Sequence, residues 1–159
     1  MIKISNLSDY ACIVTSSLLR EEKACLSASE LSQQTGFAQP TVSKVLKLLN
    51  DADIVQSTRG VNGGYRAAKP AGQISVADVI RAIDGAPTLT SCALDDSQCQ
   101  YSDECQLRGT WQLVNAAITS ALDAITFEHM TQSMSLNSIK QAIVAAWMPN
   151  SSQTQGVDS

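Results

Sequence analysis

The chain begins with apolar and polar positions that alternate with the period of an α-helix. Apolar side chains recur along one face, at Leu7, Tyr10, Ala11, Val14 and Leu18. Asn6 is a good N-cap residue, and Asp9 follows it by three positions, as in a capped helix start. The pattern therefore predicts a first helix that begins near Asn6 and buries one face against a core.

Two further helices are predicted on either side of a tight turn. Ser27 and Glu30 have the spacing of a capping box, and Thr35-Gly36 ends that helix. Pro40 suits the first position of the next helix, because its missing N–H needs no partner there. This third helix has a buried stripe, at Val42, Val45, Leu46 and Leu49, and a small polar and basic outer face, at Thr41, Ser43, Lys44 and Lys47. The arrangement indicates a helix-turn-helix, with a generic helical hairpin as the alternative.

A β-hairpin is predicted directly after these helices. Residues 54–59 have strand composition, residues 60–64 are rich in glycine, and Tyr65-Arg66-Ala67 returns. A hairpin in this position is typical of a wing. Arg59 at its tip is placed to enter a minor groove, and Arg66 or Lys69 could meet phosphates. The alternative for Arg59 is a solvated turn residue.

Two more helices follow, and the second has the pattern of a dimer seam. Ser75-Val76-Ala77-Asp78 is a capped start, and Gly85-Ala86-Pro87 stops that helix. Apolar residues then recur at alternating steps of four and three, at Leu107, Trp111, Val114, Ile118, Ala121 and Ile125. Such a seam predicts pairing with a second copy of the chain, although packing on its own head domain is the alternative. A last helix capped by Ser135 is predicted up to Pro149, and residues 150–159 are expected to be disordered.

Charge is distributed unevenly along the 159 residues. The net charge is −4, but residues 1–70 carry eight Lys/Arg against six Asp/Glu, and residues 71–159 carry three against nine. A mildly basic first half and an acidic second half fit a DNA-binding head with a regulatory tail. No apolar run approaches the length of a membrane span, so we expect no membrane partner and a cytoplasmic location.

Five cysteines, an odd number, argue against a disulfide framework and favour metal or redox chemistry. Three of them, Cys92, Cys99 and Cys105, lie in a short acidic segment at spacings wider than those of a zinc knuckle. Thiolates select zinc, copper(I) or iron–sulfur clusters, and the wide spacing favours a cluster. Cys12 and Cys25 are interpreted as small, buried or half-buried hydrophobes rather than ligands. The alternatives are three unligated thiols or a zinc-stabilised interaction module.

Three thiols leave the fourth ligand of such a cluster open. The single histidine, His129, is far along the chain, so a carboxylate or a small molecule is expected as the fourth ligand. The candidate carboxylates are Asp95, Asp96, Asp103, Glu104 and Asp9. An oxygen ligand binds iron less firmly than a thiolate, which suits a sensor better than an electron carrier. The chain contains no Ser/His/Asp or Cys/His set and no phosphate loop, so no enzyme is predicted.

The chain resembles the Rrf-two family of bacterial winged-helix regulators, which includes IscR, NsrR and RirA relatives. The resemblance runs from Met1 to about Met130 and rests on residues 7–11, 40–49, 59–65 and 74–80 together with the three cysteines. The run 40–49 is most similar to the branch that regulates the SUF iron–sulfur assembly operon. The resemblance implies a homodimer on a pseudo-palindromic promoter site, with the third helix in the major groove and the wing arginine in the minor groove. It also implies a cluster on Cys92, Cys99 and Cys105.

Two features bear on the fourth ligand. IscR-type members use a histidine just after the last cysteine, where this chain has Leu107-Arg108. NsrR-type members use an aspartate of the first helix of the partner subunit, a position that matches Asp9. Asp9 also has a purely structural reading, as the N3 carboxylate of its own helix. The cluster type, 2Fe–2S or 4Fe–4S, stays open.

We therefore expect a mostly α fold in five parts: a winged helix-turn-helix DNA-binding domain with a two-stranded β-wing (1–85), an iron–sulfur cluster-binding loop (86–106), a dimerisation helix (107–130), a C-terminal helix (131–149) and the tail (150–159). The expected function is cluster-dependent transcription regulation on double-stranded promoter DNA, as a repressor of SUF cluster-assembly genes. The expected DNA contacts are Thr41, Ser43, Lys44, Lys47, Arg59 and Arg66. A nitric-oxide- or iron-responsive repressor of the same fold is the main alternative.

Overall fold

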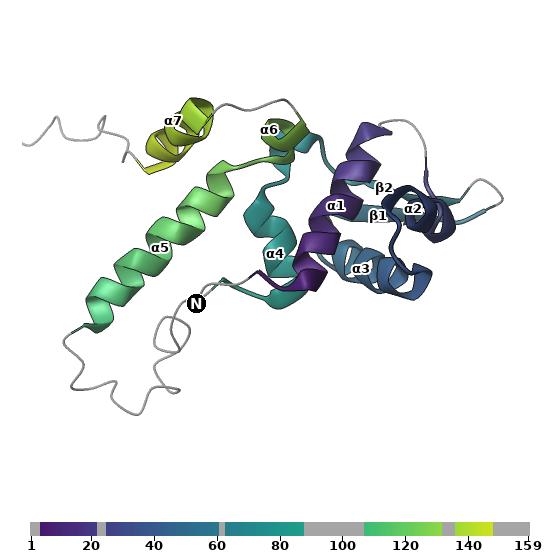
Figure 1. The fold of residues 1–159 in the computed structure, drawn as a ribbon, viewed down its shortest axis with the longest axis horizontal. Helices are drawn as coiled ribbons and strands as arrows, with labels where there is room; N and C mark the ends of the chain where they lie inside the picture. The colour runs from purple at the N-terminus through teal and green to yellow at the C-terminus, as the bar shows by residue number, and fades with distance from the viewer. Residues whose placement is uncertain (1–3, 22–24, 61–62, 88–106, 132–135, 148–159) are drawn as a thin grey trace, which may run out of the picture.

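The computed structural model describes residues 4–21, 25–60, 63–87, 107–131 and 136–147. Its elements are α1 (Asn6–Arg20), α2 (Ala28–Thr35), α3 (Gln39–Asp51), β1 (Val55–Thr58), β2 (Gly64–Ala67), the 3-10 turn η1 (Ala71–Gln73), α4 (Val76–Asp84), α5 (Arg108–Ala124), α6 (Phe127–Thr131) and α7 (Leu136–Trp147). Figure 1 shows α1 to α4 and the hairpin gathered into a compact head. The long helix α5 extends outward from this head, with its C-terminal end at the head and α7 beside it. The order and kinds of elements confirm a mostly α fold with a two-stranded sheet.

The head has one core, made almost entirely of aliphatic side chains. Buried residues of α1, α2, α3, α4, α6 and β1, and of the segments that flank them, form it: Ala11, Val14, Leu18, Leu26, Leu31, Val42, Val45, Leu46, Leu49, Ile54, Val55, Ile74, Val79 and Phe127. The predicted apolar stripe of α3 is completely buried, which is what orients the opposite face of that helix outward.

The N-cap of the first helix is Ser5, one residue before the predicted cap Asn6. Ser5, in an extended conformation, is the N-cap, and its Oγ accepts a hydrogen bond from the Ser8 N–H at 3.1 Å. Asn6 is instead the first helical residue. Both residue types cap helices well, so the prediction of Asn6 was wrong by one position, and a tertiary contact of Ser5, described below, distinguishes the two.

Thr15 is a buried polar residue in α1 whose hydroxyl is left unsatisfied. Within the described part of the chain its Oγ1 has no hydrogen-bond partner. Thr15→Val keeps the β-branched shape and removes this hydroxyl, so we expect the free energy of unfolding to rise by about 1 kcal/mol. Denaturant titration measures the change. Ser17→Ala is the control, since the Ser17 hydroxyl already donates to the Ile13 carbonyl; a decreased midpoint for Thr15→Val would contradict the prediction.

The helix-turn-helix has the predicted local signals. Glu30 accepts hydrogen bonds from both the N–H and the hydroxyl of Ser27 at 2.7 Å, and these bonds lower the pKa of Glu30. Gly36 ends α2 with φ +74°, a left-handed conformation that favours glycine. Pro40 occupies the second rather than the first position of α3, where its missing N–H is equally harmless. The capping box and the glycine stop are confirmed.

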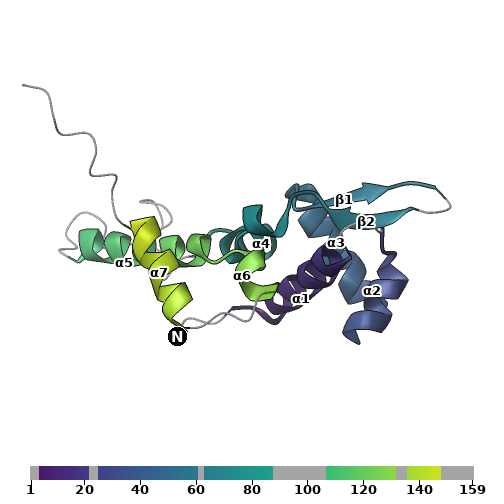
Figure 2. The same ribbon diagram turned by 90° about the horizontal axis from the view of Figure 1, so that it is seen from above.

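The wing is the antiparallel pair β1–β2, with Val55 opposite Ala67 and Thr58 opposite Gly64. Leu26 adds a short third segment, because it exchanges backbone hydrogen bonds of 2.9 and 2.8 Å with Tyr65. A Cβ on Gly64 would lie 2.8 Å from the Leu26 backbone, so glycine permits this close approach. The hairpin projects beyond α1, α2 and α3 in the view of Figure 2.

The range 107–130, expected as one helix, contains two. After α5 the chain extends at Ile125 and Thr126 and pairs with residues Ile74 to Val76 of the head, through Val76 N to Ile125 O at 2.8 Å and Phe127 N to Ile74 O at 2.9 Å. The Phe127 side chain is 0% exposed. Residues after α5 thus complete the core of the head, a connection that period alone did not predict.

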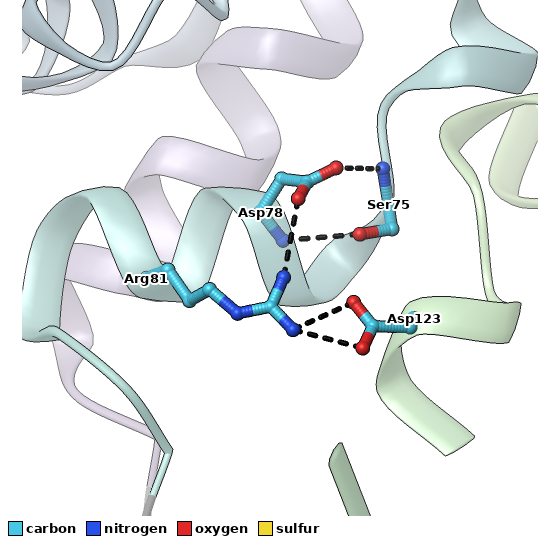
Figure 3. A network of polar contacts seen from close by, with 4 residues as sticks. All are labelled: Ser75, Asp78, Arg81 and Asp123. Carbon is cyan, nitrogen blue, oxygen red and sulfur yellow. Dashed lines mark hydrogen bonds and ion pairs between the residues drawn. The ribbon is translucent and has the colours of Figure 1, made fainter. Parts of the chain in front are cut away.

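An ion-pair network also joins α5 to the head (Figure 3). Ser75 and Asp78 form the capping box of α4. Arg81 donates from Nη1 to Asp78 at 3.2 Å and from Nη2 to both carboxylate oxygens of Asp123 at 2.8 Å. Because Asp123 lies in the last turn of α5, this guanidinium sets where the long helix meets α4.

The apolar seam of α5 is covered along only part of its length. Its C-terminal half is partly buried and α5 packs against α4 and α7. Toward the N-terminal end, Leu107, Trp111 and Val114 are exposed, and Leu113 beside them is 73% exposed. Among the described helices, none is both long and apolar enough to cross a membrane.

Candidate nucleic-acid interface and the cysteine segment

The outer face of α3 presents the predicted DNA-contacting residues together. Ser43, Lys44 and Lys47 are exposed, and Thr41 is half-buried near the start of the helix. Ser43 and Lys47 are four residues apart and therefore lie on one face of the helix. Thr41 is therefore less accessible to DNA than Ser43 and Lys44.

The turn before α3 is held by contacts that sequence reasoning missed. The Ser32 hydroxyl donates to the Phe37 carbonyl at 2.6 Å. The Phe37 ring packs against Tyr10 of α1, with ring centroids 4.3 Å apart. Tyr10 was assigned only to the buried face of α1. The contact between the two rings means that α1 helps to position the N-terminal end of α3.

The wing carries two exposed arginines and is tied to α3. Arg59 follows β1 at the hairpin tip, and Arg66 on β2 donates to the Gln56 side chain at 3.4 Å. Within β1, the Ser57 N–H donates to the Asn50 side chain at 3.1 Å. Since Asn50 belongs to α3, this bond couples the direction of the wing to the helix.

Positive charge on this side of the head is available to an external anion. The ion pairs found among the described residues both use Arg81, which lies on α4. Lys44, Lys47 and Arg59 are exposed and form no ion pair with a described acid. Cationic side chains on a protruding helix and hairpin can meet phosphates on both sides of a groove.

The cysteines that were predicted to bind the cluster, Cys92, Cys99 and Cys105, lie outside the described residues, as do the local acidic candidates, Ser135 and the tail 150–159. Asp9 is described, and it is exposed on the first turn of α1. With Ser5 as the N-cap, Ser8 occupies N3, so the reading of Asp9 as the N3 carboxylate is wrong. In the part of the chain described here, its carboxylate forms no hydrogen bond or ion pair.

Cys12 and Cys25 are half-buried thiols of the head. The Cys25 Sγ lies 3.9 Å from the Thr58 hydroxyl. Burial, and then the neighbouring charge of Asp9, raise the pKa of Cys12 to about 11. Cys12 therefore stays a neutral thiol near pH 7, in agreement with its interpretation as a small hydrophobe.

A stability loss at high pH is expected from Cys12. Its pKa is raised from the ordinary 9.0 to about 11 in the folded protein, so the stabilising contribution is complete below pH 9 and is lost as pH rises through 11. We expect the difference in unfolding free energy between wild type and Cys12→Ala to shrink across this window. Denaturant titrations at several pH values measure it, and a difference that stays constant would contradict the assignment.

A helix-turn-helix with an exposed basic third helix, followed by a β-hairpin with an arginine at its tip, defines a winged-helix DNA-binding protein. The Rrf2 family, described as an iron-dependent transcriptional regulator, matches residues 4–133 of this chain. The chain belongs to the Rrf2 family. It is accordingly a transcriptional regulator and not an enzyme.

Relatives and solved structures agree with this assignment. The HTH-type transcriptional regulator IscR of Xenorhabdus nematophila is 29% identical over 114 residues, which are 72% of this chain and 69% of that protein. IscR of Citrobacter koseri is 26% identical over 137 residues, or 86% and 83% of the two chains. The structure of T. potens IscR has a TM-score of 0.63 at 22% identity, covering 87% of this chain and 96% of that one. The global cysteine regulator CymR of B. subtilis has a TM-score of 0.65 at 22% identity, with coverage of 85% and 100%. These structures share the fold of this chain.

Proposed function

We propose that this protein is a cytoplasmic, homodimeric regulator whose DNA binding depends on an iron–sulfur cluster, and that it represses the SUF cluster-assembly genes. The observation that carries the proposal is the Cys92-x6-Cys99-x5-Cys105 segment attached to a winged-helix head. Three soft thiolate donors suit iron–sulfur clusters, whose irons are ordinarily bound by cysteine. When bound, the cluster would supply redox chemistry and a labile ligand set. The similarity of residues 40–49 to the SUF branch supports the choice of target.

Asp9 supports an oxygen donor as the fourth ligand, from the first helix of the partner subunit. Its carboxylate is exposed and has no described hydrogen bond to give up. This feature also favours the second candidate function, a nitric-oxide- or iron-responsive repressor of the same fold, because a weakly held iron accepts other ligands. Exposing the loaded protein to nitric oxide and to an iron chelator, while following DNA binding, separates the two candidates.

The dimer is supported by the uncovered part of the α5 seam. Residues 109–122 contain no charged side chain, and Leu107, Trp111 and Val114 along the seam are exposed. A second copy related by a twofold axis would cover this surface and place two heads on one duplex.

The cluster is tested by purifying the protein without oxygen. We expect a coloured protein with visible absorption and matching iron and acid-labile sulfide, and the spectrum identifies a 2Fe–2S or 4Fe–4S cluster. Cys99→Ser should lose the chromophore, whereas the matched control Cys25→Ser, in the head, should keep it. Colourless protein with stoichiometric zinc would contradict cluster sensing.

Asp9→Ala should hasten cluster loss; an unchanged spectrum and lifetime would remove Asp9 as the ligand.

The docking of the head predicts which cations matter for DNA. Replacing Lys44 or Arg59 with alanine removes a contact to a base or phosphate, so each should weaken binding to the SUF promoter fragment roughly tenfold. Lys47→Ala should weaken binding to all sequences alike and lower the salt slope by about one. Lys140→Ala on α7 is the control. Fluorescence anisotropy at several salt concentrations measures these effects, and full affinity in Lys44→Ala and Arg59→Ala would contradict the docking.

A further inference from the structure

Two helices of the head that are distant in sequence are joined through one carboxylate. Asp84, the last residue of α4, accepts a hydrogen bond from the Ser5 hydroxyl at 2.8 Å and another from the Ser8 hydroxyl at 2.7 Å. Each hydroxyl uses a different oxygen of the carboxylate. Figure 1 shows the beginning of α1 and the end of α4 side by side at this point.

The carboxylate of Asp84 is stabilised by its position at the start of α1. An acid in the last turn of a helix is disfavoured by the dipole of that helix, but the same carboxylate here lies at the N-terminal end of α1, where a negative charge is favoured. Hydrogen bonds from a hydroxyl to a carboxylate are stronger than neutral ones. Ser8 is 0% exposed, so its hydroxyl would be left buried and unsatisfied without Asp84.

The position of Asp84 connects two parts of the proposed sensor. On one side, Ser8 is directly followed by Asp9, the candidate ligand for the partner's cluster. On the other, Gly85 follows α4 as its C-cap with φ +84°, and the chain continues toward residues 88–106 with the three cysteines. From α1, the Tyr10 ring reaches Phe37 in the turn before α3. A continuous set of contacts therefore leads from the end of α4 to the DNA-reading helix.

We propose that Asp84, held by Ser5 and Ser8, is a positioning residue that transmits the state of the cysteine segment to the DNA-binding head. The proposal rests on the proposed function, because it presumes a cluster whose loss alters DNA affinity. Asp84 is not a ligand in this scheme. It holds the start of α1 against the point from which the cysteine segment departs, so a displacement on either side is felt on the other.

The test compares the DNA affinities of cluster-loaded and cluster-free protein, and takes their ratio as the coupling. Asp84→Asn keeps the size of the side chain but weakens both hydrogen bonds, and Ser5→Ala removes one of them together with the N-cap hydroxyl of α1. We expect the wild-type ratio to fall about fivefold or more in Asp84→Asn and to fall less in Ser5→Ala, with the cluster spectrum retained. Ser17→Ala, a hydroxyl of the same helix bonded to its own backbone, should leave the ratio unchanged.

The outcomes separate the two proposals. If both forms of Asp84→Asn lose DNA affinity equally, so that the ratio is unchanged, Asp84 is only structural and the inference is overturned. A wild-type protein that binds a cluster with no change in DNA affinity, or binds none, overturns the proposed function together with it. Should Asp84→Asn fold poorly, amide exchange in the turn before α3 gives a second readout away from the substituted cap: in Ser5→Ala the change in protection on cluster loss should be smaller there than in wild type, and an equal change overturns the inference.

Discussion

Phe127→Ala should lower the free energy of unfolding by about 3–5 kcal/mol, the cost of removing a large buried aromatic side chain. Phe127 is 0% exposed and is one of the largest buried side chains of the head. Its N–H also donates to the Ile74 carbonyl, which fixes the chain as it returns from α5. The cavity left by alanine would be lined by residues of a rigidly packed core, which relaxes only in part. Chemical denaturation followed by circular dichroism measures the loss.

Met130→Ala is the matched control for Phe127, because it lies on the same short helix α6 and its side chain is 53% exposed. It should change stability by less than about 0.5 kcal/mol. Equal effects of the two substitutions would show that α6 does not complete the core of the head. The prediction implies that truncation before Phe127 also destabilises the DNA-binding part.

Val114→Glu should separate the dimer and weaken binding to a palindromic promoter site by roughly a hundredfold or more. The reason is that a monomer has one DNA-binding head and cannot occupy both half-sites at once. Val114 is exposed on the uncovered seam of α5, so the change should leave the folded monomer intact. Burying an unpaired carboxylate between two apolar faces is costly. Sedimentation measures the oligomeric state, and anisotropy measures the DNA affinity.

Gln112→Glu supplies the control for Val114→Glu, since Gln112 is exposed on the same helix but outside the heptad seam. It introduces the same charge and should leave a dimer. A wild-type protein that sediments as a monomer, or a Val114→Glu protein that remains a dimer with full DNA affinity, would remove α5 as the dimer interface. Loss of the dimer in both variants would indicate that the added charge, and not its position on the apolar seam, separates the subunits.

Local signals in the sequence predicted most of the head. The Ser27–Glu30 and Ser75–Asp78 capping boxes, the stop at Gly36 and the buried stripe of α3 depend on interactions between residues three or four positions apart. Such interactions are formed largely by the element itself, so the pattern alone specifies them. The same holds for the hairpin, whose glycine-rich turn and short strands predicted the β1–β2 pair.

The candidate site was predictable where it consists of one face of one helix. Ser43, Lys44 and Lys47 are exposed because the opposite stripe of α3 is buried, and amphipathic spacing reveals both faces at once. The contact of Phe37 with Tyr10 depends on how α1 packs against the turn before α3. No periodicity within either segment contains that information.

By itself, the sequence determined the helix-turn-helix, the wing and the exposed basic face, because each follows from neighbours along the chain. Only the tertiary structure decided that Asp84 binds the hydroxyls of Ser5 and Ser8, that Asp123 pairs with Arg81, and that Phe127 belongs to the core of the head. The partners in these contacts are distant in sequence, as with Ser8 and Asp84, which are 76 residues apart. Contacts of this kind form when elements that are distant in sequence pack together. Local sequence patterns did not predict them, because the residues around each partner carry no information about which distant residue it will contact.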